Sequence, residues 1–510
     1  MSSHVNRGLA WVGVASSMVG LLDLVAILVI LNTWISTEEY GIATKCIWIF
    51  PILDQATDLG LSAAVIQRDD HSEAKISTVF WINLGTATLL FLGLVLVAPI
   101  VATHFYGHTV IGWMLIAYGT KLLFQNFYFI PVAMMKRELR FKELSVIRIV
   151  ANLAEFIGKI GFAWAGFGIW CFVLGPMARV LVTGIGAQLR HPWRPRFILR
   201  MREAKEYVTF GLKSSGSQIL FYFYTNVDYP IVGYYFGDHA LGVYRLAYEV
   251  VLEPVRMISN VIVDIAFPAF ARLRHDATKL IAQFVSFTKL NLITVMTYSA
   301  IVLVAADDVL AVIFPKYAAA AGAVQILCVV AVLRAVSFVV PPLLDGVGRP
   351  DRTFTYTVTA AILLPLAYIG SAVLLGDQLG FLSVAVGWAV GYPIAFGVLI
   401  YLAIHTLGWS LRAYVKAVAG VAACMVAAGA VGFGVHLLLS GQGHALRLIV
   451  TAIVVVGVTG LLLAYTQGLS IRTAQRAMRG EPTALARKPE EIASDTEAAA
   501  APAEPPATSG

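Results

Sequence analysis

The chain has 510 residues, of which 59% are hydrophobic and only 13% are charged, and its net charge is +7. Soluble domains average about 25% charged residues, so this composition excludes an ordinary soluble protein. Apolar runs of 20 or more residues recur between residues 9 and 467, which is typical of a polytopic helical membrane protein.

The N-terminal apolar stretch and the cysteines exclude two other classes. The stretch 9–34 is too long for the apolar part of a signal peptide, and no cleavage site with a soluble domain follows it. The cysteines lie far apart in apolar surroundings, at Cys46, Cys171, Cys328 and Cys424. This spacing indicates neither a disulfide framework nor a metal site, and we expect no cofactor.

We predict an all-α fold with fourteen membrane spans. In chain order they cover residues 9–34, 40–66, 76–104, 109–134, 143–165, 168–189, 207–235, 240–268, 281–305, 319–344, 354–375, 380–404, 413–439 and 446–467. The loops on one side of these spans carry 23 lysines and arginines, and those on the other side carry only Lys316 and Arg447. By the positive-inside rule, both termini are predicted to be cytoplasmic.

The basic loops explain the net charge, so we do not interpret them as nucleic-acid binding. The stretch His191-Pro192-Trp193-Arg194-Pro195-Arg196 is predicted to lie at the cytoplasmic headgroup surface. No outer loop exceeds about 15 residues, too few for the soluble domains on which membrane-embedded synthases and ligases often carry catalytic groups. Residues 480–510 are rich in Ala, Glu and Pro and predict a disordered cytoplasmic tail.

Two short matches indicate an internal repeat. Gly13-Val14-Ala15-Ser16-Ser17 resembles Gly211-Leu212-Lys213-Ser214-Ser215, and Glu39-Tyr40-Gly41-Ile42 resembles Ala240-Leu241-Gly242-Val243. Parallel repeats of this kind place a transporter's substrate site between the lobes. We predict two six-helix lobes, at 1–205 (with a basic linker) and 206–405, followed by two trailing helices at 406–479.

Charged residues inside the spans are the main candidates for function. A cation at the bilayer centre costs about 2.5–3.5 kcal/mol on insertion scales, so such residues usually face a wet cavity, a partner or a substrate. Ten are present: Lys45, Lys121, Arg148, Lys159, Arg179, Lys213, Arg245, Arg256, Lys289 and Arg334. They outnumber the acids in the spans, which suits an anionic cargo.

Helical spacing and position divide these cations. Arg245, Glu249 and Arg256 share one face of the eighth span, with Glu253 beside it, and Lys121 has no acid in its own helix. Arg148, Arg179 and Lys159 are interpreted as mainly structural, and Lys159 is expected to pair with Glu155, four residues earlier on the same helical face. The predicted substrate-binding residues are Lys45, Lys121, Lys213, Arg245 and Arg256, and the acids predicted to carry a coupling proton or an ion pair are Asp58 and Glu249.

Several motifs resemble the polysaccharide-biosynthesis flippases, the Wzx-type translocases of the multidrug/oligosaccharidyl-lipid/polysaccharide exporter superfamily. The matching segments are Glu39-Tyr40-Gly41, 58–68, 80–83, 135–141, 241–248, 267–270 and 345–350. The resemblance covers about residues 8–350. It implies a two-lobed bundle that moves undecaprenyl-diphosphate-linked oligosaccharide to the periplasmic leaflet through a cationic cavity. By position, Lys45, Lys213, Arg245 and Arg256 fall on helices that would line it.

The sequence therefore predicts a flippase of the bacterial inner membrane, working by alternating access for exopolysaccharide, capsule or O-antigen synthesis, and no enzymatic activity. Its expected partners are the lipid-linked oligosaccharide, membrane lipids, and polysaccharide polymerase and chain-length proteins. Three alternatives stay open: a cation-coupled multidrug exporter of the same superfamily, a membrane-embedded glycosyltransferase, polymerase or ligase, and a scaffold of an envelope-assembly complex.

Overall fold

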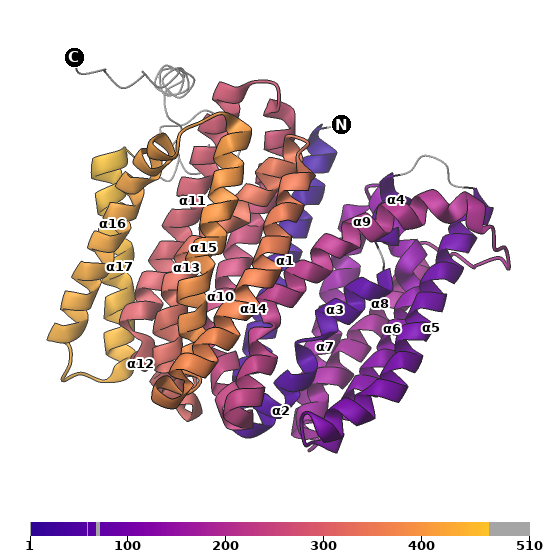
Figure 1. Cartoon of the computed structure of the whole chain (residues 1–510), viewed down its shortest axis with the longest axis horizontal. Helices are drawn as coiled ribbons and strands as arrows, with labels where there is room; N and C mark the ends of the chain where they lie inside the picture. The colour runs from indigo at the N-terminus through magenta and orange to yellow at the C-terminus, as the bar shows by residue number, and fades with distance from the viewer. Residues whose placement is uncertain (1, 59, 68–71, 469–510) are drawn as a thin grey trace, which may run out of the picture. The chain divides into compact units, whose positions relative to one another are not determined.

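The structure, a computed structural model, describes residues 2–58, 60–67 and 72–468, except for the side chains of residues 2–17, 63, 67, 202–204, 206, 210–214 and 467. The predicted tail at 480–510 lies outside the described residues. All regular elements of the described part are helical, which confirms the all-α class (Figure 1). They are α1 (Ser2–Thr33), α2 (Thr37–Ile47), α3 (Phe50–Asp58), α4 (Leu61–Gln67), α5 (Glu73–His104), α6 (Thr109–Arg137), α7 (Phe141–Trp164), η1 (Gly168–Trp170), α8 (Cys171–Arg190), α9 (Met201–Asn226), α10 (Asp228–Leu273), α11 (Ala277–Val304), α12 (Ala306–Ile313), η2 (Pro315–Ala320), α13 (Ala321–Gly346), α14 (Pro350–Leu379), α15 (Leu382–Leu407), α16 (Leu411–Leu438) and α17 (His444–Gln467).

The helices have the length and surface of membrane spans. By length and composition, eight helical segments among the described residues can cross a membrane; they lie in α5, η1–α8, η2–α13 and α11, and in α14 to α17. Large apolar side chains are exposed along α5 and α14, including Leu96, Leu366 and Leu374. Soluble proteins rarely expose apolar surface on this scale, so these faces contact lipid and the chain is a multi-pass membrane protein.

The chain divides into two compact units. Unit 1 comprises Met1–Arg245, Phe314–Tyr317 and Ala372–Val384, and unit 2 comprises Leu246–Ile313, Ala318–Ser371 and Ala385–Gly510. The main boundary thus falls inside α10, at Arg245. The predicted lobes at 1–205 and 206–405 and the fourteen-span count stay predictions.

Unit 1 is built on neighbouring pairs of long helices. α5 packs on α6, α6 and α7 both pack on α8, and α1 packs on α7. Between α5 and α6, the Asn83 side chain donates a hydrogen bond of 2.9 Å to the side-chain oxygen of Asn126, and both residues are buried. The hydrophobic effect does not drive helices together inside a lipid bilayer, so polar contacts such as this one help to hold neighbouring helices together.

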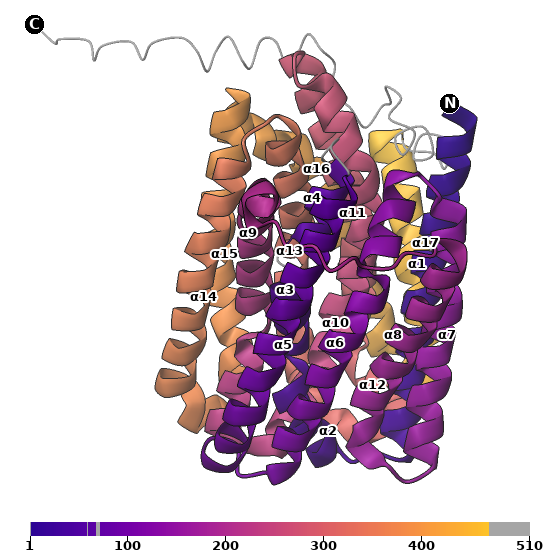
Figure 2. The same ribbon diagram turned by 90° about the vertical axis from the view of Figure 1, so that its right-hand side faces the viewer.

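Unit 2 has α13 as its most buried membrane-length helix. α11 packs on α13 and α16, and α16 packs on α17 (Figures 1 and 2). Buried Asn291 of α11 is hydrogen-bonded to Ser259 of α10 and donates to the backbone oxygen of Ala335 in α13 at 2.6 Å. α14 and α15 lie side by side, with the rings of Tyr368 and Trp388 at a centroid distance of 5.1 Å.

The second expected span is interrupted, and a kink separates the seventh expected span from the eighth. The span 40–66 consists of α2, α3 and α4, because Pro51 has no N–H to continue a helix from α2 and Gly60 takes a positive φ of 66°. The expected spans 207–235 and 240–268 leave residues 236–239 between them, and the structure has a kink there instead of an open loop. Gly237, inside α10, is non-helical with φ 82°.

α2 and α10 cross in unusually close contact. A Cβ on Gly41 would collide with the backbone oxygen of Asp238, and a Cβ on Gly242 would collide with that of Thr37. Each glycine thus faces the residue four positions before the other glycine, so the two contacts are reciprocal. This is the arrangement expected if Gly41 and Gly242 are equivalent positions of a repeat, as the matching segments predicted.

This crossing predicts a sharp difference between two glycine substitutions. Gly41→Ala is expected to lower the free energy of unfolding by about 1–3 kcal/mol, because the new methyl group overlaps a backbone carbonyl that cannot move away. Thermal unfolding in detergent measures the change. The matched control is Gly93→Ala in α5, where a Cβ meets nothing within 4 Å and alanine favours the helix. Equal effects at the two positions would contradict the close crossing.

Candidate functional site

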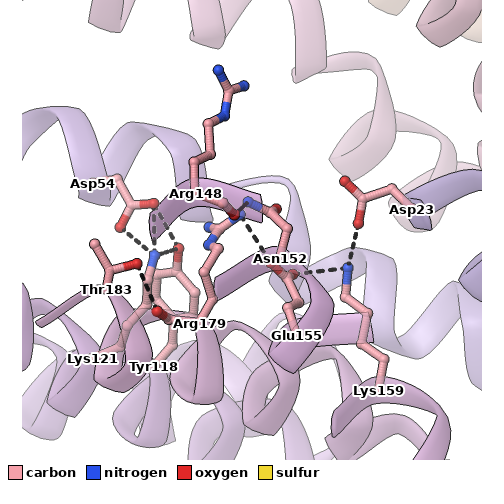
Figure 3. Close-up of polar contacts among 10 residues, drawn as sticks. All are labelled: Asp23, Asp54, Tyr118, Lys121, Arg148, Asn152, Glu155, Lys159, Arg179 and Thr183. Carbon is pink, nitrogen blue, oxygen red and sulfur yellow. Dashed lines mark hydrogen bonds and ion pairs between the residues drawn. The ribbon is translucent and has the colours of Figure 1, made fainter. Parts of the chain in front are cut away.

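A cluster of charged side chains joins five helices of unit 1 (Figure 3). Lys121 and Glu155 are buried, whereas the side chains of Arg179 and Asp23 are half-exposed. The left part of the cluster in this view joins α3 to α6. Lys121 Nζ lies 2.8 Å from both carboxylate oxygens of Asp54, and Tyr118 Oη and Gln125 Nε2 donate to the same carboxylate at 2.9 and 2.7 Å. The Lys121 side chain is 2% exposed and that of Asp54 is 34% exposed. The acid that Lys121 lacks in its own helix therefore comes from α3.

The right part of the cluster joins α8, α7 and α1. The Glu155 carboxylate, 5% exposed, binds Arg179 Nη1 at 3.0 Å and Lys159 Nζ at 2.8 Å. Lys159 also binds Asp23 of α1 at 3.1 Å. The Glu155–Lys159 pair predicted from spacing is present. Figure 3 shows the Arg148 side chain pointing away from Glu155.

The charges of this cluster balance. Lys121, Arg179 and Lys159 are matched by three acids, so these six groups carry no net charge. Isolated charges in hydrocarbon cost several kcal/mol, and pairing across helices removes most of that cost. The excess of cations predicted for the interior is thus not found in this set.

A second ion cluster lies beside the α2–α10 crossing. The Asp238 carboxylate binds Lys45 Nζ at 2.5 Å and His108 Nε2 at 2.6 Å. Lys45 is buried, and its ammonium lies 5.4 Å from the ring centroid of Tyr106. The structure therefore pairs the predicted cation Lys45 with an acid of α10 and brings α2, α6 and α10 together at one carboxylate.

The remaining predicted cations differ in accessibility. Arg256 is 46% exposed and pairs with Glu253 one turn earlier, with Nε at 2.9 Å. Arg245 is half-buried with its guanidinium carbon 4.7 Å from the centroid of the Tyr229 ring. Lys213 belongs to α9, but its side chain lies outside the described residues.

The two predicted acids are placed on different helices. Asp58, at the end of α3, accepts a hydrogen bond of 3.0 Å from the backbone N–H of Ser62. Glu249 is half-buried on α10. Asp58 belongs to unit 1 and Glu249 to unit 2, and the grouping of the predicted residues into one substrate site stays a prediction. Within the described part of the chain, no group of three His, Cys, Asp or Glu side chains could hold a metal ion.

Two groups of polar contacts in unit 2 were not predicted, although Arg334 was among the ten cations found in the spans. Arg334 donates to Tyr248 Oη at 2.9 Å, and its guanidinium carbon lies 5.2 Å from the ring of Trp388. Asp308 of α12, fully buried, binds Arg447 at 2.8 Å and His444 at 2.7 Å. Arg447 could have indicated this contact, because it and Lys316 are the two cations in the predicted outer loops.

Comparison with known proteins identifies the family. A sequence model of the family described as "Polysaccharide biosynthesis protein" matches residues 30–320, more than half of the chain. The chain belongs to this family. The match includes α2, the α2–α10 crossing, Arg256 and all of the charged cluster except Asp23.

Curated relatives extend the likeness along the chain. The teichuronic acid biosynthesis protein TuaB of Bacillus subtilis is 26% identical over 86% of this chain and 90% of its own length. The lipopolysaccharide biosynthesis protein WzxC of Escherichia coli is 26% identical over 80% of this chain and 82% of its own length. Both therefore match this family member well beyond the residues of the family model.

Solved structures show the fold. The lipid II flippase MurJ in an inward closed conformation is similar with a TM-score of 0.69 and 12% identity, covering 89% of this chain and 97% of that chain. An inward-facing multidrug transporter of the MATE family, in the MOP superfamily, is similar with a TM-score of 0.61 and 15% identity. The match covers 79% of this chain and 96% of that chain. These likenesses establish an all-α fold of the MOP type.

The shared carboxylate of Glu155 leads to a stability prediction. Glu155→Gln is expected to lower the free energy of unfolding by about 3–5 kcal/mol, because it leaves Arg179 without this carboxylate and Lys159 with Asp23 as its remaining acid. Denaturant unfolding in mixed micelles measures the change.

The control is Asp276→Asn at the N-cap of α11. There a hydrogen bond from Lys279 lowers the pKa of the Asp276 carboxyl, but the group is exposed and Asn caps a helix about as well. We expect little change. Tolerance of Glu155→Gln to the same degree would contradict the ion network.

Proposed function

We propose that this protein is a flippase that moves undecaprenyl-diphosphate-linked oligosaccharide units across the bacterial inner membrane for polysaccharide synthesis. Membership of the polysaccharide biosynthesis family carries the proposal, together with the eight helical segments of the described residues that are long and apolar enough to cross a membrane. The relatives named for teichuronic acid and lipopolysaccharide biosynthesis and the fold shared with a lipid II flippase support it. No bond is made or broken, so the protein is a transporter and not an enzyme.

The topology completes the proposal. Fourteen spans with both termini in the cytoplasm put the 23 loop cations on the cytoplasmic side. The two cations in the predicted outer loops both have partners in the structure. Arg447 binds Asp308, and Lys316 donates to the backbone oxygen of Leu31 at 3.4 Å. The reciprocal contacts of Gly41 and Gly242 support parallel repeats and hence two six-helix lobes followed by two trailing helices.

Among the predicted cations, Arg256 is the one proposed to contact the diphosphate first. Its guanidinium is half exposed, and its one-turn pair with Glu253 costs little to open. Lys45 and Lys121 are buried and paired with Asp238 and Asp54, and drawing them toward a cargo separates each lysine from its acid. We propose that Lys45 and Lys121 shape the interior, while Arg256, Arg245 and Lys213 receive the anionic head group.

Flipping of fluorescent polyprenyl-diphosphate-linked oligosaccharides in proteoliposomes tests the function. We expect transport by the wild type and roughly tenfold slower transport by Arg256→Ala, because a hydrogen bond between charged groups contributes about 1.5–3 kcal/mol. Lys279→Ala, which removes an exposed cation at the start of α11, is the matched control and is expected to be neutral. Export of cationic drugs without any flipping would instead indicate a multidrug exporter, and unchanged flipping by Arg256→Ala would contradict the proposed contact alone.

Proton coupling through Asp58 and Glu249 is tested in the same vesicles under an imposed pH gradient. If either carboxyl carries the coupling proton, Asp58→Asn or Glu249→Gln abolishes the response of the flipping rate to the gradient while flipping at equal pH continues. A response that persists in both variants would remove these two acids from the coupling mechanism.

A further inference from the structure

The loop of residues 191–200 between α8 and α9, here called the α8–α9 strap, is fixed to the first turns of α5 (Figure 1). Trp81 Nε1 donates to the backbone oxygen of Arg196 at 2.8 Å. The backbone N–H of Arg200 donates to the hydroxyl of Thr78 at 3.0 Å. These bonds hold the loop backbone in place, so its outward side chains have a defined direction.

The strap divides its aromatic residues between the interior and the surface. The Trp193 ring packs on Phe80, with 5.4 Å between ring centroids, next to the apolar core of unit 1. The Phe197 ring stacks on Trp81 at 5.0 Å and is nevertheless 93% exposed, and Leu199 beside it is exposed as well. A stacked aromatic pair with an open outer face is typical of the belts that membrane proteins place at the lipid–water boundary.

Positive charge surrounds these exposed apolar side chains. Arg194, Arg196 and Arg200 of the strap are exposed, and Arg196 is compensated by Glu73 at 2.8 Å. The adjoining ends of α6, α7 and α8 add exposed Lys136, Lys142 and Arg190. Clusters of this kind beside a membrane helix attract anionic phospholipids, each cation contributing about 1 kcal/mol near the surface.

The length of α5 sets the depth of the strap. α5 has 32 residues, or about 48 Å at 1.5 Å per residue. The strap contacts its first turns, from Glu73 to Trp81, and the remaining residues 82–104 extend about 34 Å, close to the ~30 Å hydrocarbon thickness. Loop backbone is not tolerated against hydrocarbon, so the strap lies at the level of the lipid head groups.

We propose that the α8–α9 strap is a membrane-surface anchor that binds anionic phospholipid. Phe197 enters the boundary between head groups and acyl chains, and Arg194 and Arg200 bind the lipid phosphates. The occupant is lipid because the strap borders α5, whose exposed Leu92 and Leu96 continue the same surface into the bilayer. This inference requires α5 to span the membrane and goes beyond the proposed transport, since it is independent of the cargo.

A fluorophore on Leu199→Cys tests the anchor in the full-length protein in vesicles. The four native cysteines are buried, so an exposed cysteine is labelled selectively. We expect lipids brominated on the acyl chains to quench this label, with brominated phosphatidylglycerol quenching at least about twofold more than brominated phosphatidylcholine at equal mole fraction. Gln442→Cys, in the exposed polar turn between α16 and α17, is the control and is expected to stay unquenched.

Two further results decide the proposal. In the double variant Arg194→Gln/Arg200→Gln, we expect brominated phosphatidylglycerol and phosphatidylcholine to quench the label equally, with quenching by phosphatidylcholine unchanged. This result would assign the selectivity for anionic lipid to these two arginines. Equal quenching by both lipids in the wild-type strap would overturn the binding of anionic lipid. A label that neither lipid quenches would overturn the anchor. Quenching of that label by iodide would show that it lies in water, and protection from iodide would show that another protein covers it.

Discussion

The cost of placing charge in hydrocarbon governs the interior of this protein. Each isolated charge there costs several kcal/mol, and the structure meets that cost by pairing charges from different helices. Lys121 of α6 meets Asp54 of α3, Glu155 of α7 meets Arg179 of α8, and Asp308 of α12 meets Arg447 of α17. Because each pair needs both helices in place, the ion pairs also determine which helices are neighbours and how each is rotated.

Asp238 shows how packing and charge depend on each other. Its backbone oxygen lies where only a glycine, Gly41, can approach, and its carboxylate holds Lys45 and His108. The close approach of α2 to α10 is what brings Lys45 within reach of this carboxylate. A larger residue at position 41 thus disturbs the helix crossing and an ion cluster together.

The charge balance of the cluster around Lys121 and Glu155 has consequences for an anionic cargo. A diphosphate can bind a paired cation only by displacing its carboxylate, and the displaced acid then needs a proton or another cation. Arg256 also has a carboxylate partner, Glu253, but its side chain is 46% exposed, so exchanging that partner costs less. The cost of exchange therefore favours initial contact between the diphosphate and exposed arginines. A buried cation binds the diphosphate only if the carboxylate that it leaves is neutralised at the same time.

The sequence alone determined that this is an all-helical membrane protein, and it also determined the order of most helices and the family resemblance. These features can be read from the sequence because the length of an apolar run and the charge of a loop are local properties. It also placed the Glu155–Lys159 pair, because i and i+4 are neighbours on any helix. Only the tertiary structure decided that Lys121 meets Asp54, 67 residues away, and that Asp308 meets Arg447. Such contacts depend on which helices are adjacent and how each is rotated, and no single segment contains that information.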